Sequence, residues 1–159
     1  MRGRTAGTRL GIRLALLALA GATPLVAQAH EEAAHGERAA VERAALDYLE
    51  GFYEGDEAKL RRGISPDVVK YGYFVPLDAS TYTGEPMSFQ QMLDYAERVK
   101  STGRTAPADA PKEVEILDLL DQTAAVKVTA FWGSDYLQLA KVDGRWKILH
   151  VLWQSPPRG

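Results

Sequence analysis

Apolar and polar residues alternate along the last third of the chain in a pattern that predicts three strands joined by two tight turns. The stretch 124–154 is interrupted by the dipeptides Gly133-Ser134 and Asp143-Gly144. Asp-Gly is a strong signal for a two-residue hairpin, because both residues tolerate the positive φ angles of a type I′ turn. A further apolar run at 114–120 precedes this stretch, and we therefore expect a four-stranded antiparallel meander.

Turns at these positions would fix which side chains share a face of the sheet, since strand side chains alternate between the two faces. The expected register pairs Leu137 with His150 and Asp135 with Leu152. One face is then apolar apart from an acid and a histidine. It carries Val126, Val128, Ala130, Trp132, Asp135, Leu137, Leu139, Trp146, Ile148, His150 and Leu152. We expect this face to be buried against the helices.

The acid and the histidine on that face, Asp135 and His150, have two interpretations. A buried acid without a partner costs several kcal/mol or shifts its pKa upward, so the pair is a candidate for the polar anchors of a pocket. The simpler interpretation is that Asp135 bonds the turn backbone and that His150 is a core histidine with ordinary partners. Residue types alone favour the simpler interpretation.

The opposite face of the meander is half polar, yet four of its side chains would form an apolar patch. We expect a homodimer through this outer sheet face, because a large exposed apolar patch usually marks association. The alternative is that these are ordinary aromatic residues of a strand surface. The residues of the patch are Phe131, Tyr136, Val151 and Trp153.

Upstream of the meander the apolar residues recur every three or four positions, which is the spacing of helices. A long helix is predicted over 37–54, ending at Gly55, and Asp56 would cap a short second helix. A strand at 68–75 follows, and a third helix begins at Ser88, which matches a capping box. This order predicts an α+β fold, with helices packed on one face of a curved sheet.

The first 29 residues have the features of a secretory signal peptide. Four arginines precede a short apolar run, and Ala27-Gln28-Ala29 fits the small-x-small rule for cleavage after Ala29. The run is too short to span a bilayer, so we expect a periplasmic or secreted protein without a stable membrane anchor. Residues 30–38 would be a flexible leader, 39–154 the folded domain and 155–159 a C-terminal tail.

Composition excludes several classes of function. The chain has no cysteine, which rules out disulfides, Fe–S clusters and thiolate zinc sites. Beyond the N-terminal arginines acidic residues outnumber basic ones, which argues against nucleic acid as a partner. No cofactor is expected. Cleavage after Ala29 would expose His30, a possible copper ligand with His35, but a solvated polar leader is the favoured interpretation, and no metal site is predicted.

The run GSDYLQLAKVDGRWKILHVLW resembles the C-terminal hairpin of the NTF2-like superfamily, in its branch described as putative lumazine-binding or SnoaL-like. The segment DYLEGFYEGDEAKL, followed by SPDV, resembles the end of that family's first helix. The resemblance covers 39–154. It implies a cone-shaped barrel in which a curved antiparallel sheet wraps around a long N-terminal helix, with two further helices and an apolar pocket between them. It implies no particular activity, because this fold hosts many functions.

Ketosteroid isomerase, a member of that superfamily, gives a sharper comparison. Its oxyanion-hole tyrosine and protonated aspartic acid align with Tyr48 and Asp135, whereas its general base aligns with Gly72. Without that base the proton transfer cannot run as it does there.

Three functions stay open at this point. The favoured one is a binding module for a small hydrophobic or aromatic molecule, without catalysis. The second is an isomerase, dehydratase or cyclase that uses His150 with Tyr48 and Asp135, and the third is a dimeric interaction protein with a filled core. A lumazine or flavin ligand is implied only by the family label. The expected ligand-binding residues are Tyr48, Phe52, Tyr71, Tyr73, Trp132, Asp135, Leu137 and His150.

Overall fold

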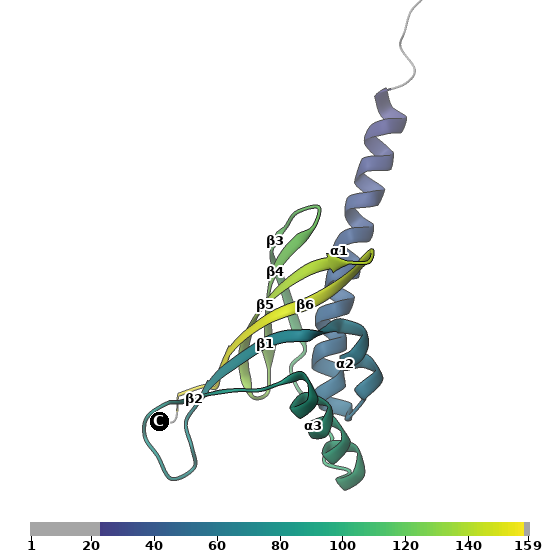
Figure 1. Cartoon of the computed structure of the whole chain (residues 1–159). Helices are drawn as coiled ribbons and strands as arrows, with labels where there is room; N and C mark the ends of the chain where they lie inside the picture. The colour runs from purple at the N-terminus through teal and green to yellow at the C-terminus, as the bar shows by residue number, and fades with distance from the viewer. Residues whose placement is uncertain (1–22, 158–159) are drawn as a thin grey trace, which may run out of the picture.

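Residues 23–157 are described by the computed structural model and form three helices and a six-stranded sheet (Figure 1). Apart from the short strand β2 (Thr83–Pro86), the order of elements is the one that the sequence predicts. They are α1 (Thr23–Glu54), α2 (Glu57–Gly63), β1 (Ile64–Phe74), β2 (Thr83–Pro86), α3 (Phe89–Thr102), β3 (Glu113–Leu119), β4 (Thr123–Ala130), β5 (Gly133–Val142) and β6 (Arg145–Gln154).

The sheet is curved and unclosed, with the strand order β2-β1-β6-β5-β4-β3 (Figure 1). We expected it to be antiparallel throughout, and this is wrong in one place, because β1 runs parallel to β6. The chain leaves β1 through β2 and α3, runs through the antiparallel meander, and returns along β1 in the same direction. The sheet is therefore mixed, and the first strand lies beside the last.

The long helix α1 provides the core against which the sheet packs. Its buried stripe consists of residues spaced three or four apart, as the sequence pattern predicts: Val41, Ala44, Ala45, Tyr48, Leu49 and Phe52. The helix begins earlier than expected. Residues 30–38, expected to be a flexible leader, are helical and largely exposed, consistent with their high content of alanine and glutamate.

The predicted signal peptide is only partly covered by the described residues. Its arginine-rich and apolar segments lie within residues 1–22, outside the described part of the chain. The predicted cleavage site at Ala29 falls inside α1. In residues 23–157, no helix is both long enough and apolar enough to cross a membrane.

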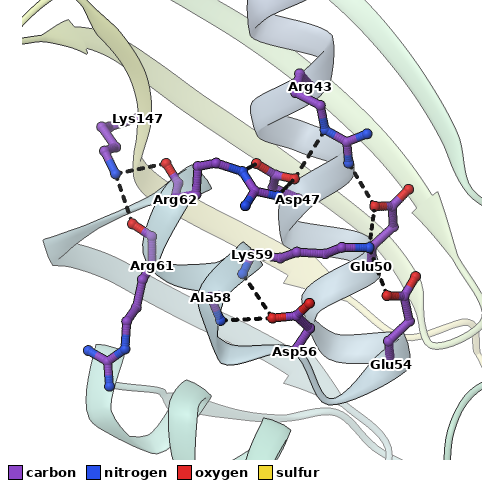
Figure 2. Close-up of polar contacts among 10 residues, drawn as sticks. All are labelled: Arg43, Asp47, Glu50, Glu54, Asp56, Ala58, Lys59, Arg61, Arg62 and Lys147. Carbon is purple, nitrogen blue, oxygen red and sulfur yellow. Dashed lines mark hydrogen bonds and ion pairs between the residues drawn. The ribbon is translucent and has the colours of Figure 1, made fainter.

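Helix α2 is joined to α1 by a tight turn and by a cluster of ion pairs (Figure 2). Gly55 has φ of 70°, and the side chain of Asp56 caps α2 by accepting from the N–H groups of Ala58 and Lys59, both as predicted. The carboxylate of Asp47, 1% exposed, accepts from Arg43 Nε at 3.1 Å and from Arg62 Nε at 2.6 Å. Asp47 is thus the buried centre of the α1–α2 contact.

The β4–β5 turn lies two residues earlier than predicted, yet the faces of the strands are unchanged. The pairing of Ala130 with Gly133 makes Phe131 and Trp132 the turn residues, in place of Gly133 and Ser134. Because a strand's side chains repeat every two residues, an even displacement keeps the same residues inside. Val126, Val128, Ala130, Asp135, Leu137 and Leu139 are accordingly all buried, as expected.

The β5–β6 hairpin follows the predicted register only as far as Ile148. Val142 pairs with Arg145 and Leu139 with Ile148, but a β-bulge then leaves Leu149 as an extra residue, and Gln138 pairs with His150. An extra residue reverses the faces of everything beyond it. The predicted inward orientation of His150 and Leu152 is therefore wrong, and both are exposed.

The same bulge turns Val151 and Trp153 inward. Val151 is 2% exposed, and Trp153 packs against the core, so neither belongs to the outer patch predicted from the sequence. Phe131 and Tyr136 stay about half exposed, at 50% and 52%. Homodimer formation through the outer face stays a prediction, now without two of its four residues.

We predict that Asp47→Asn lowers the free energy of unfolding by about 1.5–3 kcal/mol, the usual worth of hydrogen bonds to a charged group. The amide loses the negative charge that Arg43 and Arg62 share. Urea denaturation measures the change. The matched control is Glu57→Gln, which removes an exposed helical ion pair with Arg61 and should cost well under about 1 kcal/mol. Equal losses in the two variants would contradict the role given to Asp47.

Candidate functional site

A cavity of about 160 Å³ lies where α1, α3 and β1 meet the β4–β5 turn and the end of β6. Its walls are largely aromatic, and Lys70 supplies its charged group. The lining residues are Phe52, Lys70, Met87, Tyr95, Phe131, Trp132 and Trp153. An apolar cavity with one charged group in its wall is the kind of site that holds small organic molecules.

Lys70 reaches this cavity because of the alternation along β1. Val68, Lys70 and Gly72 lie on the buried face of β1, whereas Val69 and Tyr71 on the other face are exposed. Lys70 is 7% exposed, and its ammonium group donates a hydrogen bond to the hydroxyl oxygen of Tyr48 on α1. A lysine this deeply buried is rare in proteins unless it is paired.

The carboxylate of Asp135 is the counter-ion of Lys70. Lys70 Nζ lies 3.8 Å from Asp135 Oδ1, and the same oxygen accepts a hydrogen bond of 3.0 Å from the Tyr48 hydroxyl. Asp135 Oδ2 accepts a hydrogen bond of 2.8 Å from Trp132 Nε1. Among the described residues no fully buried side-chain N or O atom lacks a partner, so every polar atom of this network has at least one.

Burial dominates the electrostatics of the network. Burial lowers the pKa of Lys70 from 10.5 to about 8, although the charge of Asp135 acts in the opposite direction. Burial also raises the pKa of Asp135, against the effects of Lys70, Trp132 and Tyr48. The pKa of Tyr48 is raised well above its usual value, by burial and then by the charge of Asp135. The pKa values of Lys70 and Asp135 therefore move toward each other.

Aromatic rings surround the ammonium group where it meets the cavity. Lys70 Nζ lies 5.1 Å from the ring centre of Phe52 and 5.6 Å from that of Trp153. Both distances are within the range of cation–π attraction. The rings partly compensate for the lost hydration of the charge while keeping the cavity wall apolar.

Gly72 makes room for one of these rings. A Cβ atom built at Gly72 would lie 1.7 Å from Trp153 Nε1, so only glycine leaves space for the indole in this position. The sequence comparison with ketosteroid isomerase placed that family's general base at Gly72. Here the indole of Trp153 occupies this space, and the nearest inward-pointing residue with proton chemistry on β1 is Lys70.

The structure brings four of the predicted site residues together. Phe52 and Trp132 line the cavity. Tyr48 and Asp135, both 0% exposed, lie behind Lys70 and Trp132 and anchor them. Because Asp135 accepts on both oxygens, it does not present a free O–H group to the cavity as the oxyanion-hole comparison would require.

The other predicted site residues lie elsewhere. Leu137 is 1% exposed and belongs to the core. Tyr71 and Tyr73 do share a face of β1, as expected, but it is the outer one, and they are 38% and 44% exposed. His150 is also outside, 3.0 Å from Gln138 Oε1, because the bulge in β6 turns it away from the cavity.

The sequence prediction missed Lys70, Met87 and Tyr95 of the cavity wall, and it assigned two further lining residues, Phe131 and Trp153, to the outer patch. The signal was present in VVKYGYFV, where one face carries two tyrosines and the other a lysine and a glycine. Hydrophobicity favoured the tyrosine face as the inner one. The glycine was the better clue, since a strand glycine often marks a close approach by another group.

Metal ligation finds no support in the described part of the chain. No group of three or more histidine, aspartate or glutamate side chains in residues 23–157 is arranged to hold a metal ion. His30 and His35 both lie in the exposed first half of α1.

We predict a specific pH dependence of stability from the lowered pKa of Lys70. Between pH 8 and 10.5 the unfolded chain keeps the Lys70 proton and the folded chain releases it, so the folded state gains stability as pH rises. Relative to Lys70→Met, the wild-type protein should gain up to about 3 kcal/mol across this window. Urea denaturation at several pH values measures this difference. Lys127→Met, on the outer face of β4, is the matched control, and its stability should depend on pH as that of the wild type does. If the stability of Lys70→Met also followed the wild-type pH dependence, burial of a charged Lys70 would be contradicted.

Comparisons with known proteins agree with the fold. The profile of the family described as "Putative lumazine-binding" matches residues 36–154. The aldolase FrzH of Cladobotryum sp. is 26% identical over 125 residues, covering 75% of this chain and 91% of the aldolase.

Two NTF2-like proteins of unknown function have similar structures. The one from Shewanella baltica OS155 has 23% identity and a TM-score of 0.57, covering 77% of this chain and 96% of that one. The one from Silicibacter pomeroyi DSS-3 has 16% identity and a TM-score of 0.60, covering 77% and 98%. The NTF2-like fold expected from the sequence is confirmed, and the chain belongs to the putative lumazine-binding family.

Proposed function

We propose that the cavity binds a small aromatic or apolar molecule that carries a carbonyl or another hydrogen-bond-accepting oxygen. The observation that carries this proposal is the placement of Lys70, whose ammonium group is buried in the wall of a cavity that is otherwise aromatic and apolar. A ligand oxygen beside Nζ would accept a hydrogen bond from a charged donor, which is worth about 1.5–3 kcal/mol.

The size of the cavity supports a ligand of about one ring. Its volume of about 160 Å³ is well below the ~300 Å³ at which sites for drug-sized molecules begin. It is close to the ~150 Å³ of an engineered apolar cavity that binds benzene. A single aromatic ring, or an apolar group of similar volume, matches this space better than the three fused rings of a flavin.

The placement of His150 weighs against the isomerase that we considered from the sequence. That mechanism needs His150 as acid and base in the cavity, and His150 is exposed on the outer face. The similarity to the aldolase FrzH supports a different second candidate, chemistry on a carbonyl compound in the same cavity. Aldol reactions act on carbonyl groups, and Lys70 is the charged donor that this cavity offers to a carbonyl oxygen.

Two further expectations from the sequence are part of the proposal. We propose that the protein acts after export, because the N-terminal 29 residues have the pattern of a signal peptide. We also propose association of two copies through the outer sheet face. There Leu152 lies between Tyr71 and Tyr136 in neighbouring strands, and all three are exposed.

We predict that acetophenone binds in the cavity more tightly than ethylbenzene, which has the same carbon skeleton without the oxygen. The three indole N–H signals report the site, because Trp132 and Trp153 line the cavity whereas Trp146 bonds Glu37 elsewhere. In NMR titrations, acetophenone should shift the signals of Trp132 and Trp153 and leave that of Trp146 unchanged. The preference for acetophenone should be about tenfold or more, the worth of one charged hydrogen bond.

The variant Lys70→Met should abolish this preference and keep weak binding of both compounds, since the aromatic walls are unchanged. Lys127→Met is the control and should retain the wild-type preference. Equal binding of the two compounds by the wild type would contradict the role of Lys70. Absence of any shift at Trp132 and Trp153 would contradict the binding site itself.

A further inference from the structure

Lys70 has the surroundings of a reactive amine. Its side chain is 6% exposed and passes between α1 and the end of β6 into the cavity wall. The rings of Phe52 and Trp153 lie on its cavity side, and the Tyr48–Asp135 pair lies behind it. Desolvation in an apolar pocket is one of the known ways in which proteins activate a lysine as a nucleophile, because burial disfavours the ammonium form.

The network behind Lys70 provides a path for its proton. Lys70 Nζ donates to the Tyr48 oxygen, and the Tyr48 hydroxyl donates to Asp135 Oδ1 at 3.0 Å. Shifting one proton along this chain converts the ammonium and carboxylate into a neutral amine and a neutral acid. The lowered pKa of Lys70 and the raised pKa of Asp135 make this transfer cheaper than it would be in water.

We infer that Lys70 forms a Schiff base with a small aldehyde or ketone held in the cavity. This inference rests on the proposed function, since it assigns a covalent step to the same pocket. The Nζ atom would face the carbonyl carbon of a ligand whose ring lies among Phe52, Trp132 and Trp153. Tyr48 and Asp135 do not touch the ligand, since neither lines the cavity, and they act only through the nitrogen of Lys70, as its proton relay.

The protons of this step are supplied and taken up by Lys70, Tyr48, Asp135 and the ligand. The Lys70 proton passes through Tyr48 to Asp135, and the neutral amine attacks the carbonyl carbon to form a C–N bond. A second proton moves from nitrogen to the former carbonyl oxygen, giving a carbinolamine. Asp135 then returns its proton through Tyr48 to the carbinolamine nitrogen, and a proton passes from this nitrogen to the hydroxyl. The C–O bond breaks, water leaves, and a protonated imine remains. The Asp135 carboxylate, 3.8 Å from Nζ before the reaction, is then the counter-ion of the imine.

The test uses benzaldehyde and sodium cyanoborohydride, which reduces protonated imines to stable secondary amines. The full chain is treated near pH 7 and digested, and the modified lysine is located by mass spectrometry. The adduct adds the mass of benzaldehyde less one oxygen atom. We expect Lys70 to be modified at least tenfold faster than any other lysine, since lysines with an ordinary pKa are almost wholly protonated at this pH.

The pH profile of the labelling separates chemical activation from mere accessibility. The labelling rate of Lys70 should level off near pH 8, where its pKa lies, instead of rising toward 10.5. The titratable groups that face Lys70 are Tyr48, Asp135 and the cavity-lining Tyr95. Asp135→Asn should move the profile of Lys70 to lower pH, because the charge of Asp135 raises the pKa of this lysine.

Two variants complete the design. Lys70→Arg keeps the charge and should lose the rapid adduct, whereas Lys127→Arg should keep it. The labelling map of the wild-type protein decides the question even if Lys70→Arg fails to fold. Adducts spread over the surface lysines, together with benzaldehyde-induced shifts at Trp132 and Trp153, would overturn the Schiff base and leave the binding site intact. If neither the adduct nor the indole shifts are observed, both the Schiff base and the binding site are overturned.

Discussion

The buried carboxylate of Asp135 is the group around which the site is assembled. It lies on β5, accepts hydrogen bonds from Tyr48 of α1 and Trp132 of the β4–β5 turn, and forms an ion pair with Lys70 of β1. A buried charge without partners costs several kcal/mol at least, so each of these elements is held where its donor meets the carboxylate. The cavity wall therefore follows from one electrostatic requirement, which the fold meets with residues that are far apart in the sequence.

The bulge in β6 decides which residues join this arrangement. The fold class, the capping box of α3, the caps around Gly55 and Asp56 and the Asp143-Gly144 hairpin were all predictable, because each depends on local chemistry. The bulge at Leu149 was not. Apart from His150, residues 148–153 are all apolar. Hydrophobicity therefore does not decide which side chains after the bulge at Leu149 point inward.

The predicted burial of side chains was correct along α1 and on the inner face of β5. Tyr48 and Phe52 follow from the spacing along α1, and Asp135 from the inner face of β5, which survived an error of two residues in the turn. Lys70 was missed because burying a lysine contradicts the usual preference of strands. Two contacts explain the inward position of Lys70. Gly72 leaves room for the Trp153 ring, and Asp135 supplies the counter-ion. Both facts depend on contacts between β1 and the C-terminal hairpin, which no local pattern contains.

The proposed site depends on a buried Lys70 amine that is paired with Asp135 and faces an apolar cavity. The most direct test is an NMR titration of the folded protein labelled with ¹³C at the lysine side chains, with Lys70 assigned by comparison with Lys70→Arg. We expect Lys70 to titrate at a pKa of about 8, and its resonance to respond when Asp135 is replaced by asparagine. A Lys70 signal that titrates at 10.5 would contradict burial of this amine, because it would place the amine in water.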